Sequence, residues 1–175
     1  ITINDMLLYA VSRVLPRYPQ LNAHMLDGLT QRRFTDVQLG MAVDTERGLM
    51  VPVIHNANHL CLEEIAAASK RLAKAAREGA LLPDDMHGGT FTVSNLGALG
   101  VESFTPIINP PETGILGICN IIERPRTNGD GGIALYPAMG LSLSYDHRAI
   151  DGAPASRFVM ELSGVLESFM IDAEL

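Results

Sequence analysis

The chain lacks a long apolar run, an excess of basic residues and a cluster of cysteines. None of its apolar stretches approaches the roughly 18 residues that a membrane-spanning helix needs. Thirteen Lys and Arg are outnumbered by twenty Asp and Glu, and no dense basic stripe is present that would neutralise a nucleic-acid backbone. We therefore expect neither a membrane nor a nucleic acid as a partner.

The two cysteines, Cys61 and Cys119, do not form a CxxC pair, and neither stands beside a histidine at metal-ligand spacing. This usage fits a reducing compartment of the cytosolic type. The first residues show neither the basic region nor the cleavage site of a signal peptide. Because a helical pattern begins almost at once, the sequence reads as a fragment whose upstream part is missing.

Length and patterning predict one α/β domain over residues 1–175. No repeat, low-complexity tract or Pro- and Ala-rich linker divides the chain, and 47% apolar residues are enough for one core. Asn4 is expected to cap the first helix, and Gly79 to end the second. Period-3.6 patterns predict helices, and β-prone or apolar runs predict strands. The helices are expected at 4–15, 62–78 and 153–169, the strands at 37–43, 49–54, 90–94, 115–122 and 139–145, and an exposed hairpin loop at 124–132.

The densest group of reactive side chains lies in Ser144–Gly152, with the sequence SYDHRAIDG. A predicted strand leads to His147 in a tight loop before the last helix, and Asp151 follows four residues later. These parts suit a general base, because imidazole titrates near neutral pH and neighbouring charges can fix its tautomer. The pattern equally fits a hydrogen-bonded structural histidine in a charged turn.

A histidine and an aspartate four residues apart can also bind a metal. Zinc, however, takes three or four protein ligands, and none of the other histidines stands in a recognisable ligand pair. The sequence therefore predicts no metal site.

A second group of polar side chains lies in Gly88–Gly97, with the sequence GGTFTVSNLG. Its β-prone part places the Ser94 hydroxyl and the Asn95 amide at a strand end, where they could stabilise an oxyanion. They could instead close a turn by bonding to their own backbone. Ser94 is a poor nucleophile candidate, because no GxSxG elbow surrounds it.

Three segments resemble, in order, those of the 2-oxo acid dehydrogenase E2 acyltransferases. Ser144–Gly152 is similar to the DHRxxDG signature of that family, Gly88–Gly97 to its GGTFTxSNxG segment, and Phe104–Glu112 to its FxxIINPPE run. Asp44–Leu49 and Val51–Val53 extend the likeness, which covers nearly the whole chain. The resemblance implies the catalytic domain of a dihydrolipoamide acyltransferase. The implied fold is α/β and chloramphenicol acetyltransferase-like, with a mixed β-sheet flanked by helices.

The resemblance also implies roles for individual residues. His147 would take the proton of an attacking thiol, Ser94 would stand beside the negative oxygen of the intermediate, and Asp151 would orient the active-site loop. A free thiol titrates near ~8.5 and imidazole near ~6.5, so a neutral histidine can accept that proton. Asp44, Ser94 and Asn95 match positions on the coenzyme A side of the channel, although Asp44 also fits an ordinary turn residue.

The substrates and partners implied by the resemblance lie partly outside these 175 residues. Coenzyme A would be a substrate, and the lipoyl group would be carried on a separate domain that is absent here. The subunit-binding domain and the amino-terminal part of the catalytic domain are absent as well. Relatives form at least a homotrimer with active sites between subunits, and up to a core of 24 or 60 subunits that works with E1 and E3 components. His147 and Ser94 would then come from different chains.

The acyl group and two other functions remain open at this level. Thr113–Gly117 looks most like the acetyl and branched-chain members, which favours acetyl. One alternative is a small-molecule O-acetyltransferase of the chloramphenicol acetyltransferase type, which shares the HxxxDG pattern. The other is a non-catalytic scaffold in the core of the complex. The expected compartment is the bacterial cytoplasm, or the mitochondrial matrix if the source is eukaryotic.

Overall fold

The structure, a computed structural model, describes residues 1–169 and interleaves helices with strands along the chain. Short 3₁₀ helices occupy Leu15–Arg17, Ala57–His59, Pro83–Met86 and Gly97–Leu99. The α-helices are α1 (Ile3–Val14), α2 (Leu62–Glu78) and α3 (Gly152–Glu167). The strands are β1 (Ala23–Leu26), β2 (Thr30–Arg33), β3 (Leu39–Met41), β4 (Val43–Thr45), β5 (Gly48–Met50), β6 (Val53–Ile54), β7 (Phe91–Asn95), β8 (Gly114–Thr127) and β9 (Ile133–Tyr145).

The central sheet has five strands in the order β6-β3-β7-β8-β9. β3, β7 and β8 run parallel to one another, whereas β6 and β9 pair antiparallel at the two edges. β1 and β2 form a separate hairpin, and so do β4 and β5. The predicted mixed sheet of an α/β fold is therefore confirmed.

Local end signals define two of the helices. Thr2 caps α1: its hydroxyl accepts from the Asp5 amide at 3.3 Å, and the Asp5 carboxylate accepts from the Thr2 amide at 2.8 Å. The prediction that Asn4 is the cap was wrong, because this reciprocal box satisfies two free amides at once. α2 has the predicted bounds and ends at Gly79, whose φ of 68° lies in the left-handed region that glycine tolerates.

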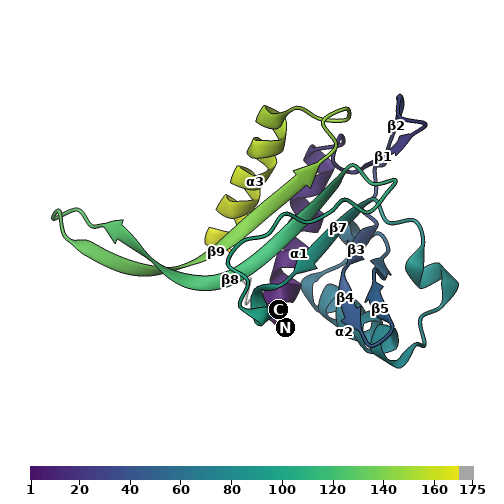
Figure 1. The fold of residues 1–175 in the computed structure, drawn as a ribbon, viewed down its shortest axis with the longest axis horizontal. Coiled ribbons are helices and arrows are strands. Elements are labelled where there is room, and N and C mark those ends of the chain that lie inside the picture. The colour runs from purple at the N-terminus through teal and green to yellow at the C-terminus, as the bar shows by residue number, and fades with distance from the viewer. Residues whose placement is uncertain (170–175) are drawn as a thin grey trace.

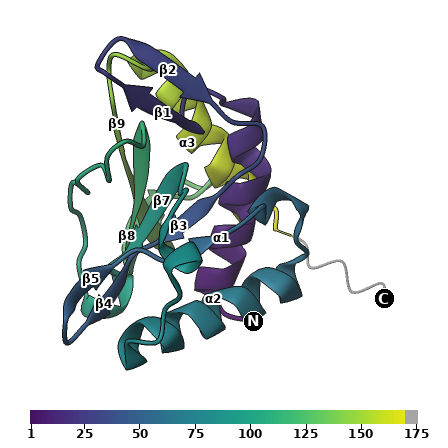
Figure 2. The ribbon, with the colours of Figure 1, turned by 90° about the vertical axis from the view of Figure 1, so that its right-hand side faces the viewer.

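The helices cover one face of the sheet, as Figure 2 shows, with α1 packed between α2 and α3. Phe91 of β7 and Phe158 of α3 are fully buried and meet edge to face, with ring centroids 5.8 Å apart. Side chains alternate between the faces of a strand, so Phe91 and Val93 enter this core. Thr92 and Ser94 are left on the opposite face, away from the helices.

β8 and β9 continue beyond the rest of the sheet as a two-stranded arm, which projects from the body in Figure 1. Their ladder runs out to the pair Thr127 and Ile133, so the turn occupies only residues 128–132. The predicted loop at 124–132 was therefore too long. The large apolar side chains exposed along the arm are Ile121, Ile133, Leu135 and Tyr136. Predicted burial of 115–122 holds only as far as Cys119, where the arm leaves the body.

The helices of the described part, residues 1–169, are all too short or too polar to cross a membrane.

Candidate active site

His147 lies in the tight loop between β9 and α3. The loop is fixed at Asp146, whose amide donates to the carbonyl of Thr113 at 2.8 Å. The carbonyl of Asp146 in turn accepts from the amides of Ala149 at 2.9 Å and Ile150 at 3.2 Å. Ile150 is buried, whereas His147 points away from the core with 70% of its side chain exposed. The backbone therefore presents the imidazole to the outside on a braced turn.

A charged pair reinforces this turn. Arg148 Nε donates to Asp146 Oδ1 at 2.9 Å, and Arg148 Nη2 donates to Asp146 Oδ2 at 2.6 Å. The hydrogen bonds from Arg148 hold the pKa of the Asp146 carboxyl below its ordinary value. The arginine also reaches the β1–β2 turn, because a Cβ on Gly28 would lie 3.1 Å from Arg148 Nη1. Asp146 and Arg148 thus connect the loop of His147 to a second hairpin.

Asp151 is the acidic residue that lies beside the His147 ring. Its Oδ1 lies 3.7 Å from His147 Nδ1, longer than a hydrogen bond but within reach of one small rotation. Asp151 is also the N-cap residue of α3, yet its side chain makes no cap hydrogen bond. Since an N-cap aspartate normally bonds a backbone amide of the first turn, this carboxylate is left available to the imidazole.

Residues distant in sequence complete the surroundings of His147. A shallow hollow of about 180 Å³ is lined by Gln20 and Arg33 together with His147, Asp151 and their loop neighbours. Gln31 holds the edge of this hollow, since its Nε2 donates to the carbonyl of Gln20 at 3.0 Å. Sequence reasoning missed Gln20 and Arg33, because no local pattern links them to a loop more than a hundred residues away.

Ser94 lies near the end of β7 in a different hollow. This hollow has a volume of about 410 Å³, and Ser94 and Thr92 line it from β7. The rest of its wall is mainly apolar and comes from the β4–β5 hairpin, β8 and the segment of residues 104–110, with Leu49, Val51, Phe104, Ile107 and Ile108 among its side chains. The Ser94 hydroxyl is therefore one of few polar groups in a largely apolar space.

The two remaining predicted residues differ in how they relate to Ser94. Asp44 is exposed and stands directly opposite Leu49 in the β4–β5 ladder, which puts both on one face of the hairpin at the rim of the hollow of Ser94. Asn95 points to the other face of β7. Its Oδ1 accepts from the Gly97 amide at 2.9 Å, and its Nδ2 donates to Asn4 Oδ1 at 3.0 Å. Asn95 thus closes a turn and contacts α1.

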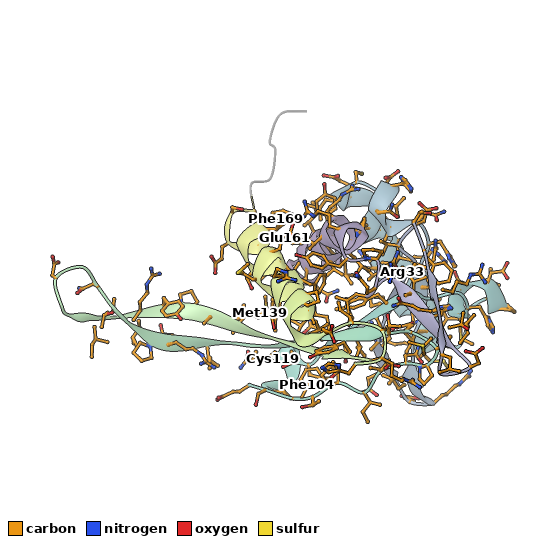
Figure 3. All side chains as sticks on the ribbon, turned by 90° about the horizontal axis from the view of Figure 1, so that it is seen from above. Arg33, Phe104, Cys119, Met139, Glu161 and Phe169 are labelled. Carbon is orange, nitrogen blue, oxygen red and sulfur yellow. The ribbon has the colours of Figure 1, made fainter. Side chains whose placement is uncertain are left out.

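Within one protomer, the structure brings His147 and Asp151 together but does not bring Ser94 to them. The two hollows share no lining residue. Arg33 of the first and Phe104 of the second lie apart in Figure 3. Among the residues of the described part of the chain, no three His, Cys, Asp or Glu side chains are grouped so as to hold a metal ion.

Replacing Asp146 by asparagine is expected to lower the melting temperature by a few degrees near neutral pH, because it removes the charged partner of Arg148. A carboxyl whose pKa is depressed by folding stabilises the fold above its ordinary pKa of 3.8 and loses that effect as the pH falls further. The difference in melting temperature between this variant and the wild type should therefore shrink as the pH falls below 3.8. Thermal unfolding measured near neutral pH and again below pH 3.8 tests this, with Asp130→Asn in the β8–β9 turn as the control. A pH-independent difference would contradict it.

Comparison with solved structures identifies the fold class. Chloramphenicol acetyltransferase superposes with a TM-score of 0.60 at 17% identity, over 94% of this chain and 78% of that one. Dihydrolipoamide acetyltransferase of Azotobacter vinelandii superposes with a TM-score of 0.90 at 39% identity, over 95% of this chain and 69% of that one. The chain therefore has the chloramphenicol acetyltransferase-like fold, and its β9–α3 loop presents His147.

Sequence comparison then identifies the family. The chain belongs to the 2-oxoacid dehydrogenases acyltransferase family (catalytic domain), which matches residues 1–171. The succinyltransferase component of the 2-oxoglutarate dehydrogenase complex of Pseudomonas aeruginosa is 44% identical over 160 residues, or 90% of this chain and 38% of that protein. The acetyltransferase component of the acetoin cleaving system of Bacillus subtilis is also 44% identical, over 95% of this chain and 42% of that protein. The chain thus spans about two fifths of the length of these relatives.

Proposed function

We propose that residues 1–175 belong to the catalytic domain of a dihydrolipoamide acyltransferase, which moves an acyl group between a dihydrolipoyl thiol and coenzyme A. The observation that carries the proposal is the presentation of His147, on a braced loop beside Asp151, in a chain of this acyltransferase family. The Azotobacter vinelandii structure was determined to investigate a serine, a histidine and an asparagine in catalysis. That asparagine follows the histidine by four residues, as Asp151 follows His147 here.

In this proposal His147 is the general base. Its neutral imidazole takes the proton of the attacking thiol, and the thiolate adds to the carbonyl carbon of the partner's thioester. The carbonyl oxygen becomes negative and accepts a hydrogen bond from the Ser94 hydroxyl. The intermediate collapses by breaking its original C–S bond, and the imidazolium returns the proton to the departing thiol. The attacking sulfur thus ends in the new thioester and the departing sulfur ends as a free thiol, with no net change of charge.

Asp151 acts on the orientation of the imidazole. Its carboxylate lies on the Nδ1 side of the ring at 3.7 Å, so an Nδ1–H directed toward it leaves Nε2 as the proton acceptor. Asp44 and Ser94 would face the coenzyme A side of the channel, on the rim and wall of one hollow. Asn95 would support that side indirectly, by holding the turn after β7.

The active site is proposed to form between protomers of at least a homotrimer. Two features of the single chain support this: His147 and Ser94 line separate hollows, and the β8–β9 arm exposes apolar side chains that a lone two-stranded ladder leaves unburied. Another relative of known structure is described as the cubic core of the pyruvate dehydrogenase multienzyme complex. A core of 24 or 60 subunits, served by lipoyl domains and by E1 and E3 components, is the corresponding proposal here.

Acetyl-CoA is expected to be used at least about tenfold more efficiently than succinyl-CoA, because the carboxylate of a succinyl group would lose hydration in a largely apolar hollow. Acetyl-CoA, isobutyryl-CoA and succinyl-CoA should be compared with dihydrolipoamide as the common acceptor, with kcat/KM as the measured quantity. A preference for succinyl-CoA would contradict the acetyl assignment.

If particles of core size show no exchange with any of the three, the chain is a scaffold and the proposed activity is wrong.

A further inference from the structure

Glu112 is a buried carboxyl that the proposed acyl transfer does not use. Only 4% of the residue is exposed, although it lies two positions after the segment of residues 104–110, which walls the hollow of Ser94. Its backbone is held at two points: the Glu112 amide donates to the carbonyl of Asn109 in the same turn at 3.0 Å, and Glu112 stands opposite His24 of β1 in an isolated antiparallel bridge. The position of its side chain is therefore set from both sides.

The two carboxylate oxygens of Glu112 bind two different walls of that hollow. Thr92 donates its hydroxyl to Glu112 Oε2 at 2.6 Å, and Asn109 donates its side-chain amide to Glu112 Oε1 at 3.3 Å. Both Thr92 and Asn109 line the hollow, and Thr92 lies two residues before Ser94 on the same face of β7. The carboxylate thus connects the strand that carries Ser94 to the end of the segment opposite it.

Gly89 shows that the fold reserves space for this carboxylate. A Cβ on Gly89 would lie 2.7 Å from Glu112 Oε1, closer than such contacts occur. The Gly88–Gly97 and Phe104–Glu112 segments, recognised separately in the sequence, therefore meet at the Glu112 side chain. A residue with a side chain at position 89 would displace Oε1, the oxygen that accepts from Asn109.

We propose that Glu112 is a positioning residue that joins Thr92 to Asn109 and so sets the shape of the hollow in which Ser94 meets the thioester. This inference rests on the proposed acyl transfer and adds a residue that acts through two others. Both hydrogen bonds run toward the carboxylate, so its ionised form is the one that holds both walls. Protonation turns one oxygen into a donor. The Thr92 hydroxyl can then keep its contact only by reversing to accept, and the stronger charge-assisted bonds to both walls are lost.

The charge state of Glu112 is sensitive to pH in the neutral range. Burial raises the pKa of its carboxyl to about 7, and the hydrogen bonds from Thr92 and Asn109 oppose that rise. Two neutral groups face the carboxylate: Thr92 from β7 and Asn109 from the segment of residues 104–110. β1 contributes His24, whose Nε2 lies 2.6 Å from the carbonyl oxygen of Gly89. His24 is the titratable member of this set and must be separated from Glu112 by experiment.

The test is the dissociation constant of acetyl-CoA, measured by calorimetry on the assembled protein from about pH 6 to about pH 8. The wild-type constant is expected to fall by about tenfold across this range, as expected for gaining one hydrogen bond to a charged group. Glu112→Gln should remove this pH dependence, since its amide does not titrate, and Glu78→Gln at the exposed end of α2 should keep it. Because Glu112→Gln leaves His24 in place, a pH profile that survives the substitution overturns the proposal.

A second variant makes the test specific for the hydrogen bond. Thr92→Val removes a bond that lowers the pKa of Glu112, so the midpoint of the binding profile should move to higher pH. An unmoved midpoint overturns the proposal, and so does a lower melting temperature of either variant with binding unchanged, which would show a purely structural role. Failure of the proposed acyl transfer looks different: the wild type itself would neither bind acetyl-CoA nor acylate dihydrolipoamide.

Discussion

Replacing His147 by alanine is expected to lower kcat for acyl exchange by about a thousandfold, a typical contribution of a positioned general base. Without the imidazole, only the small thiolate fraction present at neutral pH can attack the thioester, because a free thiol titrates near ~8.5. The fold should be unaffected, since 70% of the side chain is exposed and its removal leaves no cavity in the core. Exchange between acetyl-CoA and dihydrolipoamide, with a melting curve for each variant, measures both.

His59→Ala is the matched control for this prediction. His59 is also an exposed histidine near an aspartate, with 66% of its side chain exposed and Nε2 2.7 Å from Asp36 Oδ1. It lies outside both hollows, so its loss should leave the exchange rate near that of wild type. Equal activity of the His147 and His59 variants would rule out His147 as the base and with it the proposed mechanism.

Parts of the fold that depend on local signals could be predicted from the sequence. The apolar period of α2 and the glycine that ends it can both be recognised within one continuous stretch of sequence. The helix occurs at the predicted 62–78. The arm was harder, because Pro125 and the charged residues around it resemble a loop. Those residues are strand because each is paired with a residue of β9, as in the register of Pro125 with Leu135. Pairing of this kind is not visible in either strand alone.

The candidate site divides in the same way. The loop of His147 could be located from its sequence, because strand, charged turn and helix follow one another directly. Glu112 could be recognised as part of a family segment but given no role, since its partner Thr92 lies twenty residues earlier and meets it only in the folded sheet. How His147 and Ser94 meet depends on the assembly of several chains, because the folded protomer keeps them in separate hollows.

Replacing Ser94 by alanine is expected to lower kcat by about a hundredfold to a thousandfold, the usual effect of removing one oxyanion donor. KM for acetyl-CoA should change much less, because the hydroxyl bonds the charged oxygen of the intermediate more strongly than the thioester carbonyl. Ser94 is half-buried, and the loss of one hydroxyl leaves its backbone pairing with β8 intact. Steady-state exchange kinetics tests the prediction, and a rise in KM at constant kcat would show that Ser94 binds substrate rather than the intermediate.

Mixing the two inactive variants tests whether the site is shared between chains. If each site takes His147 from one protomer and Ser94 from its neighbour, an assembly formed from equal amounts of His147→Ala and Ser94→Ala chains has each native residue in half of its positions. Independent pairing then restores about one quarter of the sites, since both native residues must meet by chance. The chains should be unfolded together and reassembled, with each variant reassembled alone as the control. An inactive mixture, in assemblies of wild-type size, would place both residues in one protomer and contradict a site shared between chains.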